Sequence, residues 1–281
     1  LGCAITGDQG QLACWGANQM GQAGDPSAAA VDSGPRLIDG ISGAIGLSVG
    51  LYHGCAWTSS GRRFCWGSNT FGQRGGAAPA QIPIREPQIV PGLEQTIQLV
   101  AGEHHFCTLD ELGVMRCWGS NGYGQLGEGS TLASPIPVPA SNLNGVAQVS
   151  AGNNFSCAVM NDGSAKCWGY NRNGQLGIGN IDNQLLPVTL NVPQLQTIRA
   201  GNSFACGLDT NGGMHCWGYG NDGVLGQGNR SSSRTPQAVP GLPTVQDFAV
   251  GYRHVCASTG SGSLYCWGRN GEGQTAQVRN K

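Results

Sequence analysis

Residues 157–169 read Cys-Ala-Val-Met-Asn-Asp-Gly-Ser-Ala-Lys-Cys-Trp-Gly, and this pattern of two cysteines around a turn recurs along the whole chain of 281 residues. Each copy begins at a cysteine and ends at Cys-Trp-Gly; the six copies span residues 3–16, 55–67, 107–119, 157–169, 206–218 and 256–268. Successive copies are about fifty residues apart, a period typical of propellers and arrays in which each repeat packs on its neighbours. The repeat therefore predicts one all-β domain, a β-propeller, over residues 1–281.

The composition agrees with an all-β domain and excludes several classes of function. Glycine is abundant, with 48 residues, and only 11% of residues are charged, which suits tight turns and short strands. A net charge of −1 argues against binding to nucleic acid, which needs clustered Lys and Arg. No apolar run reaches the roughly 20 residues of a membrane-spanning helix. The sequence begins without an initiator Met or a signal peptide, so we expect a mature or trimmed product.

The two cysteines of each copy are expected to face each other across a β-hairpin. Aligning Cys107 with Cys117 places Thr108 opposite Arg116 and closes the strands at a glycine-containing turn. Opposed residues that are not hydrogen-bonded to each other approach closely enough for a disulfide. The expected bonds are Cys3–Cys14, Cys55–Cys65, Cys107–Cys117, Cys157–Cys167, Cys206–Cys216 and Cys256–Cys266. Disulfides predict an oxidising location: extracellular, cell-surface or periplasmic.

Metal sites are the competing interpretation of the cysteines and of the acidic turns. Zinc sites normally bring cysteines together two to four residues apart in the chain, and no such pair exists here. The turns at residues 161–164 and 209–212 resemble calcium loops but lack the carboxylate that ends a twelve-residue loop. We therefore expect turn residues at these places, no metal site and no cofactor.

Each repeat contains four short extended segments. The fullest copy starts with a proline-containing segment at Pro137, of the kind that suits an outer edge strand. Residues 146–151 follow, with apolar residues at alternating positions, as an inner strand requires. The cysteine hairpin adds two more strands, and a glycine-rich loop at residues 171–177 leads to the next repeat. Four strands per repeat make a propeller blade.

The pattern Ala-Gly-x-x-His-x-Cys-Ala, followed by Cys-Trp-Gly-x-Asn-x-x-Gly-Gln-Leu-Gly, resembles the regulator-of-chromosome-condensation (RCC1-type) repeat, in a cysteine-paired version similar to secreted bacterial proteins. The resemblance covers essentially the whole chain and implies a β-propeller, usually of seven blades. Two repeats depart from it. The fifth, at residues 217–225, lacks the Asn and Gln of the motif, and the last ends Gly273-Gln274-Thr275-Ala276, without Leu-Gly.

The number of blades follows from counting the segments separately. The cysteine hairpin occurs six times, whereas the inner-strand and proline segments occur five times each. Residues 275–278 resemble residues 146–149 and could supply a missing inner strand beside Cys3. Six blades are therefore favoured, five full and one shared by the two termini. A trimmed seven-bladed ring is the alternative.

An enzyme is not expected. His53, His105 and His254 occupy one repeat position, and Phe155 and Phe204 fill that position in the other blades. A position that accepts phenylalanine within the same molecule indicates packing or hydrogen bonding rather than catalysis. No His-Glu-x-x-His motif or phosphate-binding loop is present, and paired cysteines cannot act as thiolate nucleophiles.

The best candidates for binding are the two variable residues that follow the glycine at the end of each inner strand. They are Leu51, Tyr52, Glu103, His104, Asn153, Asn154, Asn202, Ser203, Tyr252 and Arg253. Blades in a ring would repeat these pairs around one face, and the loops that contain Phe71 and Tyr123 could add to them. The sequence thus predicts an extracellular, disulfide-stapled propeller that binds another protein or acts as a scaffold. A carbohydrate-binding propeller and a self-assembling surface protein are the alternatives, so a glycan or a second copy could replace the protein partner.

Overall fold

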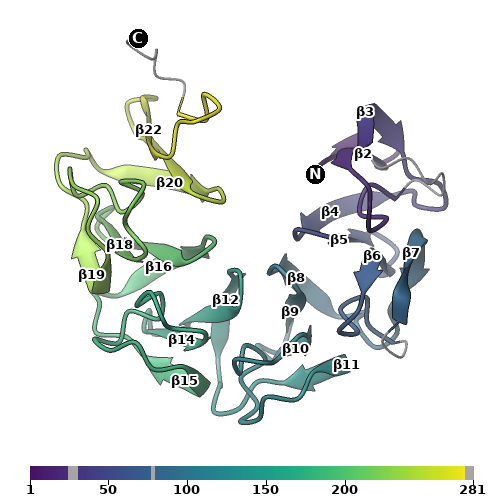
Figure 1. Cartoon of the computed structure of the whole chain (residues 1–281), viewed down its shortest axis with the longest axis horizontal. Coiled ribbons are helices and arrows are strands. Elements are labelled where there is room, and N and C mark those ends of the chain that lie inside the picture. Colours follow the sequence, from purple (N-terminus) through teal and green to yellow (C-terminus); the bar gives the residue numbers. More distant parts are fainter. Residues whose placement is uncertain (25–30, 77–79, 276–281) are drawn as a thin grey trace.

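The computed structural model describes residues 1–24, 31–76 and 80–275, and arranges them as six antiparallel sheets around a common axis. Figure 1 looks into the ring, which is open between the sheet at the N-terminal end and the sheet at the C-terminal end. The described part of the chain contains no helix. Nothing in that part could therefore serve as a membrane-spanning helix. The predicted all-β propeller with six blades is confirmed.

The strands of each blade follow one another in the chain. The first blade contains β1 (Gly2–Thr6), β2 (Gln11–Ala17) and β3 (Val31–Leu37), and the second contains β4 (Ala44–Val49), β5 (His53–Thr58), β6 (Arg63–Asn69) and β7 (Ala80–Ile89). The third contains β8 (Thr96–Ala101), β9 (His105–Asp110), β10 (Met115–Gly119) and β11 (Ser134–Pro139). The fourth contains β12 (Val146–Ala151), β13 (Phe155–Met160), β14 (Ala165–Gly169) and β15 (Gln184–Thr189). The fifth contains β16 (Leu195–Ala200), β17 (Phe204–Asp209), β18 (Met214–Gly218) and β19 (Ser233–Ala238), and the sixth contains β20 (Val245–Val250), β21 (His254–Thr259) and β22 (Leu264–Gly268).

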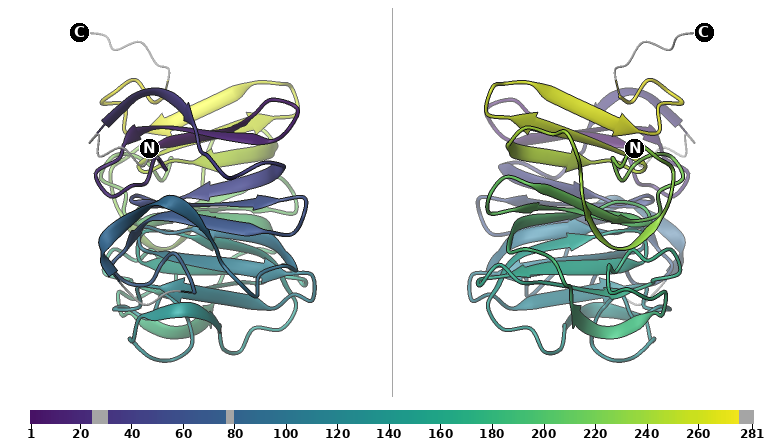
Figure 2. Two further views of the ribbon diagram at one scale, coloured as in Figure 1. Left: turned by 90° about the vertical axis from the view of Figure 1, so that its right-hand side faces the viewer. Right: turned by 90° about the vertical axis from the view of Figure 1, so that its left-hand side faces the viewer.

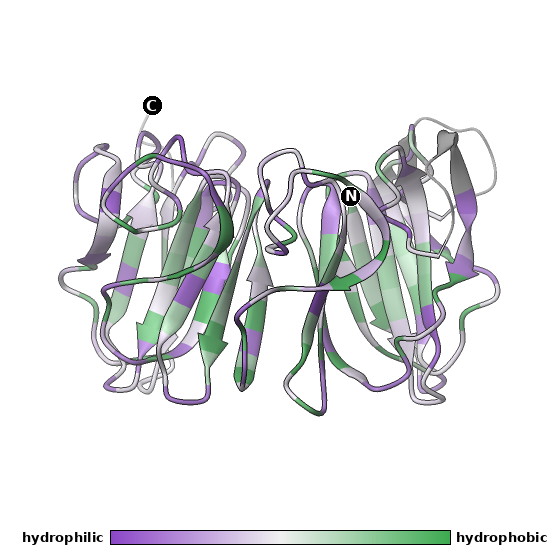
Figure 3. Ribbon diagram, turned by 90° about the horizontal axis from the view of Figure 1, so that it is seen from below, coloured by the Kyte–Doolittle hydropathy of each residue, from purple (hydrophilic) through white to green (hydrophobic). Residues whose placement is uncertain are grey.

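In a complete blade the sheet order equals the chain order, from the inner strand beside the axis to the proline-containing outer strand. Among the described residues, the first blade has no inner strand and the sixth has no outer strand, so four blades are complete rather than the expected five. The five inner and five outer segments of the sequence do not belong to the same five blades. The side views in Figure 2 show the blades following one another around the ring, and Figure 3 shows strands running between two loop-bearing faces. Of the proposed closing segment, Thr275 lies in a loop, where its N–H donates to the Asn270 side chain at 3.1 Å. Residues 276–278 lie outside the described residues, so closure by the C-terminus stays a prediction.

The cysteine hairpins have the predicted register. Cys107 pairs with Cys117, Thr108 with Arg116 and Leu109 with Met115. Each of the six predicted disulfides joins two directly opposed residues whose Cα atoms are 4.1 Å apart. Every bond therefore staples one hairpin within a blade, and none of them joins two blades.

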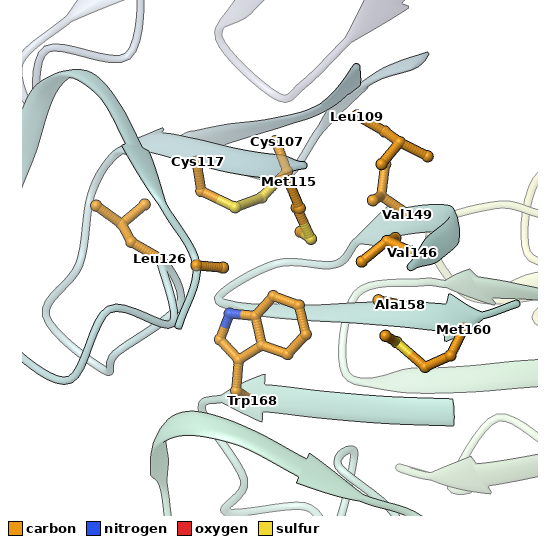
Figure 4. Packing of buried hydrophobic residues seen from close by; sticks show 11 residues of the cluster. Cys107, Leu109, Met115, Cys117, Leu126, Val146, Val149, Ala158, Met160 and Trp168 are labelled. Carbon is orange, nitrogen blue, oxygen red and sulfur yellow. A yellow bond between two sulfur atoms is a disulfide. The ribbon is translucent and has the colours of Figure 1, made fainter. Parts of the chain in front are cut away.

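Blades are joined by the tryptophans that follow the second cysteines. The Trp118 indole N–H donates to the Gln73 carbonyl of the preceding blade at 2.9 Å, and Trp168 donates to Gln125 at 3.0 Å. Three further tryptophans also donate to a carbonyl of the preceding blade: Trp66 to Gln22, Trp217 to Gln175 and Trp267 to Val224. Figure 4 shows Trp168 beside Leu126 in the cluster between the third and fourth blades. The indole supplies both buried apolar area and a satisfied polar group, which fixes how one blade lies on the next.

The free edges of the inner strands are covered by side chains of neighbouring blades. The Gln148 side chain accepts a hydrogen bond from the Ile198 N–H at 2.9 Å and donates to the Ile198 carbonyl at 3.0 Å. The Ser150 hydroxyl accepts from the Ala200 N–H at 2.9 Å. These bonds occupy backbone groups that an exposed sheet edge would offer to another chain.

Glycine ends the inner strand of each complete blade for a steric reason. A Cβ on Gly152 would overlap the Phe155 ring and lie 2.7 Å from the Gly201 carbonyl of the next blade. A Cβ on Gly102 would meet the His105 ring and the Gly152 carbonyl at 2.6 Å. Neighbouring blades thus come into close contact around the axis at these glycines, where a side chain would not fit.

Candidate binding face

The turns after the inner strands converge at one end of the ring axis. The first residue of each predicted pair lines a cavity of about 490 Å³ there; these residues are Leu51, Glu103, Asn153, Asn202 and Tyr252. Glycines at the ends of the inner strands form much of the remaining wall. We call this cavity the channel mouth. The structure therefore brings together, in one site, residues that lie about 200 positions apart in the chain, as the approximately fifty-residue period requires.

Backbone hydrogen bonds connect one pair to the next around the channel mouth. The Glu103 N–H donates to the Asn153 carbonyl at 3.2 Å, Asn153 donates to Asn202 at 3.3 Å, and Asn202 donates to Tyr252 at 3.4 Å. The Asn153 side-chain amide also donates to the Asn202 side-chain oxygen at 2.7 Å. The wall of the channel mouth is thus held by the third to sixth blades together.

The second residues of the pairs contact the loops that follow Cys-Trp-Gly on the same face. Tyr52 stacks on the His104 ring with centroids 5.7 Å apart, and Phe71 meets that ring edge-on at 5.5 Å. The Asn154 side-chain oxygen accepts a hydrogen bond from the Gln125 side chain at 3.3 Å. We call the channel mouth and these surrounding loops the mouth face.

The side chain of Arg253 contacts two residues, Tyr219 and Asp222, that were not predicted from the sequence. Its guanidinium lies 3.3 Å from the Asp222 carboxylate and over the rings of Tyr219 and Tyr252, at 5.5 and 5.6 Å. Tyr219 follows Cys-Trp-Gly directly, as Tyr170 does, and Tyr170 packs against Tyr123 at 4.7 Å. An aromatic residue immediately after the repeated tripeptide was the available signal.

The mouth face carries several exposed apolar and aromatic side chains. Leu51, Phe71, Tyr123 and Tyr252 are exposed, Tyr252 to 58%. Burial raises the pKa of Glu103 and lowers the pKa of the neighbouring His104, whose Nε2 lies 3.8 Å from the Glu103 carboxylate. Within the described ranges, no three His, Cys, Asp or Glu side chains form a group that could hold a metal ion. The acidic turns use their carboxylates locally: Asp209 accepts from the Asn211 and Gly213 N–H groups, at 2.8 and 2.9 Å.

Two histidines of the repeated position, His53 and His105, lie in the blade interior, whereas His254 is partly exposed. His53 and His105 are fully buried. The His105 Nε2 lies 2.9 Å from the Ser156 hydroxyl, and the His53 ring packs edge-on against Phe106 at 4.5 Å. Neither ring nitrogen of His53 has a hydrogen-bond partner. These contacts support the packing role predicted from the interchange with phenylalanine.

Substitution of His53 by phenylalanine is expected to make the protein more resistant to acid. Burial, together with His104 and His105 nearby, lowers the pKa of His53 to about 3 from 6.5. The pKa of His53 is lower in the folded protein than in the unfolded chain. Its effect on stability is therefore absent above pH 6.5, and the folded protein loses stability as the pH falls from 6.5 towards 3. At pH 4 this proton linkage costs on the order of 3 kcal/mol, and His53→Phe should remove that cost. Urea unfolding at pH 7 and pH 4 measures the difference.

The reciprocal change supplies the control for that prediction. Phe155 occupies the equivalent position in the fourth blade and is fully buried. Phe155→His should therefore make the protein more acid-sensitive while His53→Phe makes it less so. An identical loss of stability between pH 7 and pH 4 in wild type and both variants would contradict a role for burial at this position.

Together, the six stapled blades, the tryptophan bonds between them and the loops gathered at one end define a repeat propeller. The chain belongs to the RCC1-like domain family, whose sequence profile matches residues 2–281. This agrees with the resemblance carried by the repeated motif.

Relatives and solved structures place the chain among propellers of this kind. The bovine secretion-regulating guanine nucleotide exchange factor is 33% identical over 146 residues, which cover 45% of this chain and 32% of that protein. The human probable E3 ubiquitin-protein ligase HERC4 is 31% identical over 129 residues, which cover 43% of this chain and 12% of that protein. The matched regions thus span a third or less of these relatives.

Two solved structures share the fold. Human WBSCR16 superposes with a TM-score of 0.84 at 23% identity, over 95% of this chain and 73% of that one. Prp20p from Saccharomyces cerevisiae superposes with a TM-score of 0.64 at 21% identity, over 94% of this chain and 82% of that one.

Proposed function

We propose that this chain is a protein-binding module that engages its partner through the mouth face. The carrying observation is the gathering of exposed Tyr252, Tyr123 and Phe71 with Arg253 at one end of the ring. Aromatic and arginine side chains are enriched among the residues that dominate protein interfaces. The rigid wall beneath them supports this role, because preorganised side chains lose little conformational entropy on binding.

The module is proposed to act without catalysis, outside the cytosol. The His105–Ser156 pair is fully buried and so closed to a substrate, and the cysteines are disulfide-bonded, which supports a role without catalysis. Six disulfides support an oxidising compartment, such as the extracellular space, the cell surface or the periplasm.

Two structures of a related propeller supply supporting analogies. One shows Kap60 bound to yeast RCC1 (Prp20), and another is the structure of Prp20p, for which binding to Gsp1p and histones is described. These partners belong to that protein. The analogy favours a protein ligand for the present chain over a glycan.

The proposal predicts that a variant with Tyr52→Ala, His104→Ala, Tyr252→Ala and Arg253→Ala will lose its partner. Oxidised wild-type protein and the variant are used as crosslinking baits on the native source, and captured proteins are purified and their affinities measured. Truncating four interface side chains together should weaken a direct complex by at least about 100-fold. Thermal melts of both baits check that the variant is folded.

Ile97→Ala with Leu112→Ala provides a matched control. Both residues are exposed; Ile97 lies near the start of β8 and Leu112 in the turn after β9, at the end of the blade away from the mouth face. The control should bind like wild type. Equal capture by all three baits would place the interface on another face, a glycan on the captured fraction would favour a lectin, and multimers of the bait alone would favour self-assembly.

A further inference from the structure

One carboxylate at the channel mouth lacks a partner. The Glu103 side chain lines the channel mouth and is only 21% exposed. Among the residues that the structure describes, none donates a hydrogen bond to this carboxylate, and the His104 Nε2 beside it lies 3.8 Å away, beyond hydrogen-bonding distance. Burial lowers the pKa of His104, so its ring is mainly neutral at pH 7 and supplies no compensating charge. Glu103 is therefore a largely covered negative charge without compensation.

Other carboxylates with comparable cover have basic partners. Three that are 25% exposed or less lie in ion pairs; the pairs are Asp110 with Arg116 at 2.7 Å, Asp209 with His215 at 2.9 Å and Asp222 with Arg253 at 3.3 Å. Glu103 differs from them in its surroundings and not in its chemistry. Covering a charge without pairing it costs free energy. An unpaired charge of this kind, at the edge of a cavity, points to a ligand that supplies the missing partner.

The main-chain donors around the channel mouth are already used. The N–H groups of the five glycines that end the inner strands donate within their own turns, at 2.8–2.9 Å; these are Gly50, Gly102, Gly152, Gly201 and Gly251. The N–H groups of Glu103, Asn153 and Asn202 each donate to the next blade. A ligand at the channel mouth therefore gains most by supplying hydrogen-bond donors of its own.

The wall of the channel mouth suits a long side chain that ends in a positive charge. Glu103 is the one charged side chain among the described residues that line the cavity. Leu1 also lines it, and its amino group forms no ion pair with Glu103. Leu51 and Tyr252 add exposed apolar and aromatic surface, against which the methylene groups of a basic side chain can pack. The cavity of about 490 Å³ has room for such a side chain.

We propose that the channel mouth binds a lysine or arginine side chain of the partner protein, with its cationic group on the Glu103 carboxylate. The side chain enters along the ring axis, its methylene groups lie against Leu51 and Tyr252, and its N–H groups donate to Glu103. A charge-assisted hydrogen bond in a partly covered site is stronger than one between neutral groups. This inference rests on the proposed protein-binding function, since it names the chemical group through which a partner engages the mouth face.

The test uses the whole chain and capped tripeptides that present one side chain each. The basic probes are Gly-Lys-Gly and Gly-Arg-Gly. Their neutral counterparts carry Nε-acetyl-lysine in place of lysine and citrulline, which has nearly the shape of arginine, in place of arginine. NMR titration follows the amide signals of Glu103, Asn153 and Asn202 at low ionic strength, because salt screens partly exposed charges.

At least one basic tripeptide should shift these signals saturably, with a millimolar Kd. Its neutral counterpart should bind at least about tenfold more weakly, the loss expected for a hydrogen bond to a charged group. The tighter of the two basic probes identifies the side chain as lysine or arginine. Equal binding of charged and neutral probes, or no saturable shift with either basic probe, would overturn the proposal.

Two protein variants assign the effect to Glu103. Glu103→Gln removes the charge and keeps the shape, and Glu111→Gln is the matched control, because Glu111 is exposed in the turn after β9. Only Glu103→Gln should weaken binding of the basic tripeptide, at least about tenfold. Its urea midpoint at pH 7 should equal or exceed that of wild type, since the carboxylate has no partner to lose. A lower midpoint, or equal weakening by both variants, would overturn the proposal.

The captured partner separates this inference from the proposed function. Glu103→Gln should weaken the complex with that partner at least about tenfold. A partner that Glu103→Gln leaves unchanged, but that the variant with four alanine substitutions loses, would overturn the basic side chain and leave the protein-binding function in place. A partner that the variant with four alanine substitutions retains would instead overturn the proposed function, whatever the tripeptides show.

Discussion

Breaking all six disulfides is expected to lower the free energy of unfolding by at most about 15–18 kcal/mol, while the reduced protein keeps its β-sheet at ambient temperature. Each bond closes a loop of ten or eleven residues, worth roughly 2.5–3 kcal/mol in the chain-entropy model. The sum is an upper limit, because a hairpin in the unfolded chain already keeps its ends close. The fold should survive because the tryptophan bonds and apolar contacts between blades do not depend on the disulfides. Melting followed by circular dichroism, with and without reductant, measures the loss.

The order of reduction gives a sharper form of this prediction. Cys157 and Cys167 are fully buried, whereas Cys256 and Cys266 are partly exposed. Thiol exchange needs access to a sulfur atom, so the Cys256–Cys266 bond should be reduced before Cys157–Cys167 under native conditions. Mass spectrometry after alkylation identifies the thiols. Simultaneous reduction of both bonds, or loss of sheet signal at ambient temperature, would show that the disulfides hold the blades together.

Replacing Gly152 by alanine is expected to destabilise the protein by about 3 kcal/mol or more. The added methyl group would overlap the Phe155 ring and crowd the Gly201 carbonyl of the next blade. Overpacking of a rigid interior typically costs 1–3 kcal/mol, and here one of the crowded groups is backbone that cannot rotate away. The Phe155 ring cannot leave without opening the buried cluster that it shares with Leu176 and Trp217. Urea unfolding of wild type and variant measures the cost.

Gly122→Ala is the matched control for this substitution. Gly122 is exposed, and a Cβ there would meet no atom within 4 Å. Its backbone also lies outside the left-handed region, so alanine should change stability by less than about 0.5 kcal/mol, as at most surface positions. A similar cost for both variants would mean that the inner-strand glycines serve chain flexibility rather than close approach between blades.

The repeated hairpin made most of the fold predictable. The period of the tripeptide predicted the blades, and the constant spacing of Cys107 and Cys117 predicted both the disulfide and the register of β9 and β10. These features depend on residues close together in sequence. The ring is open between the first and sixth blades, and no pattern local to one repeat reports how blades from the two ends of the chain lie.

The positions of the candidate binding residues in the fold were predictable, but their contacts were not. Glycine followed by a variable pair placed Tyr52 and Tyr252 correctly at the turns after the inner strands. Tyr219 and Asp222 joined Arg253 only through the packing of one blade on the next. Such contacts depend on side-chain directions across a blade interface, which spacing along the chain does not encode.

The tryptophan bonds between blades have a direction. Trp168 donates backward to the loop of the third blade, while Gln175, in the loop of its own blade, accepts from Trp217 of the fifth. Every internal blade thus presents a donor on one side and an acceptor on the other. Deleting or duplicating a whole repeat at the genetic level would rejoin the same donor to the same acceptor. Proteins encoded by such altered genes would differ in blade number and keep the same interface between blades. An insertion of half a repeat would instead bring together two blade surfaces without a matching donor and acceptor.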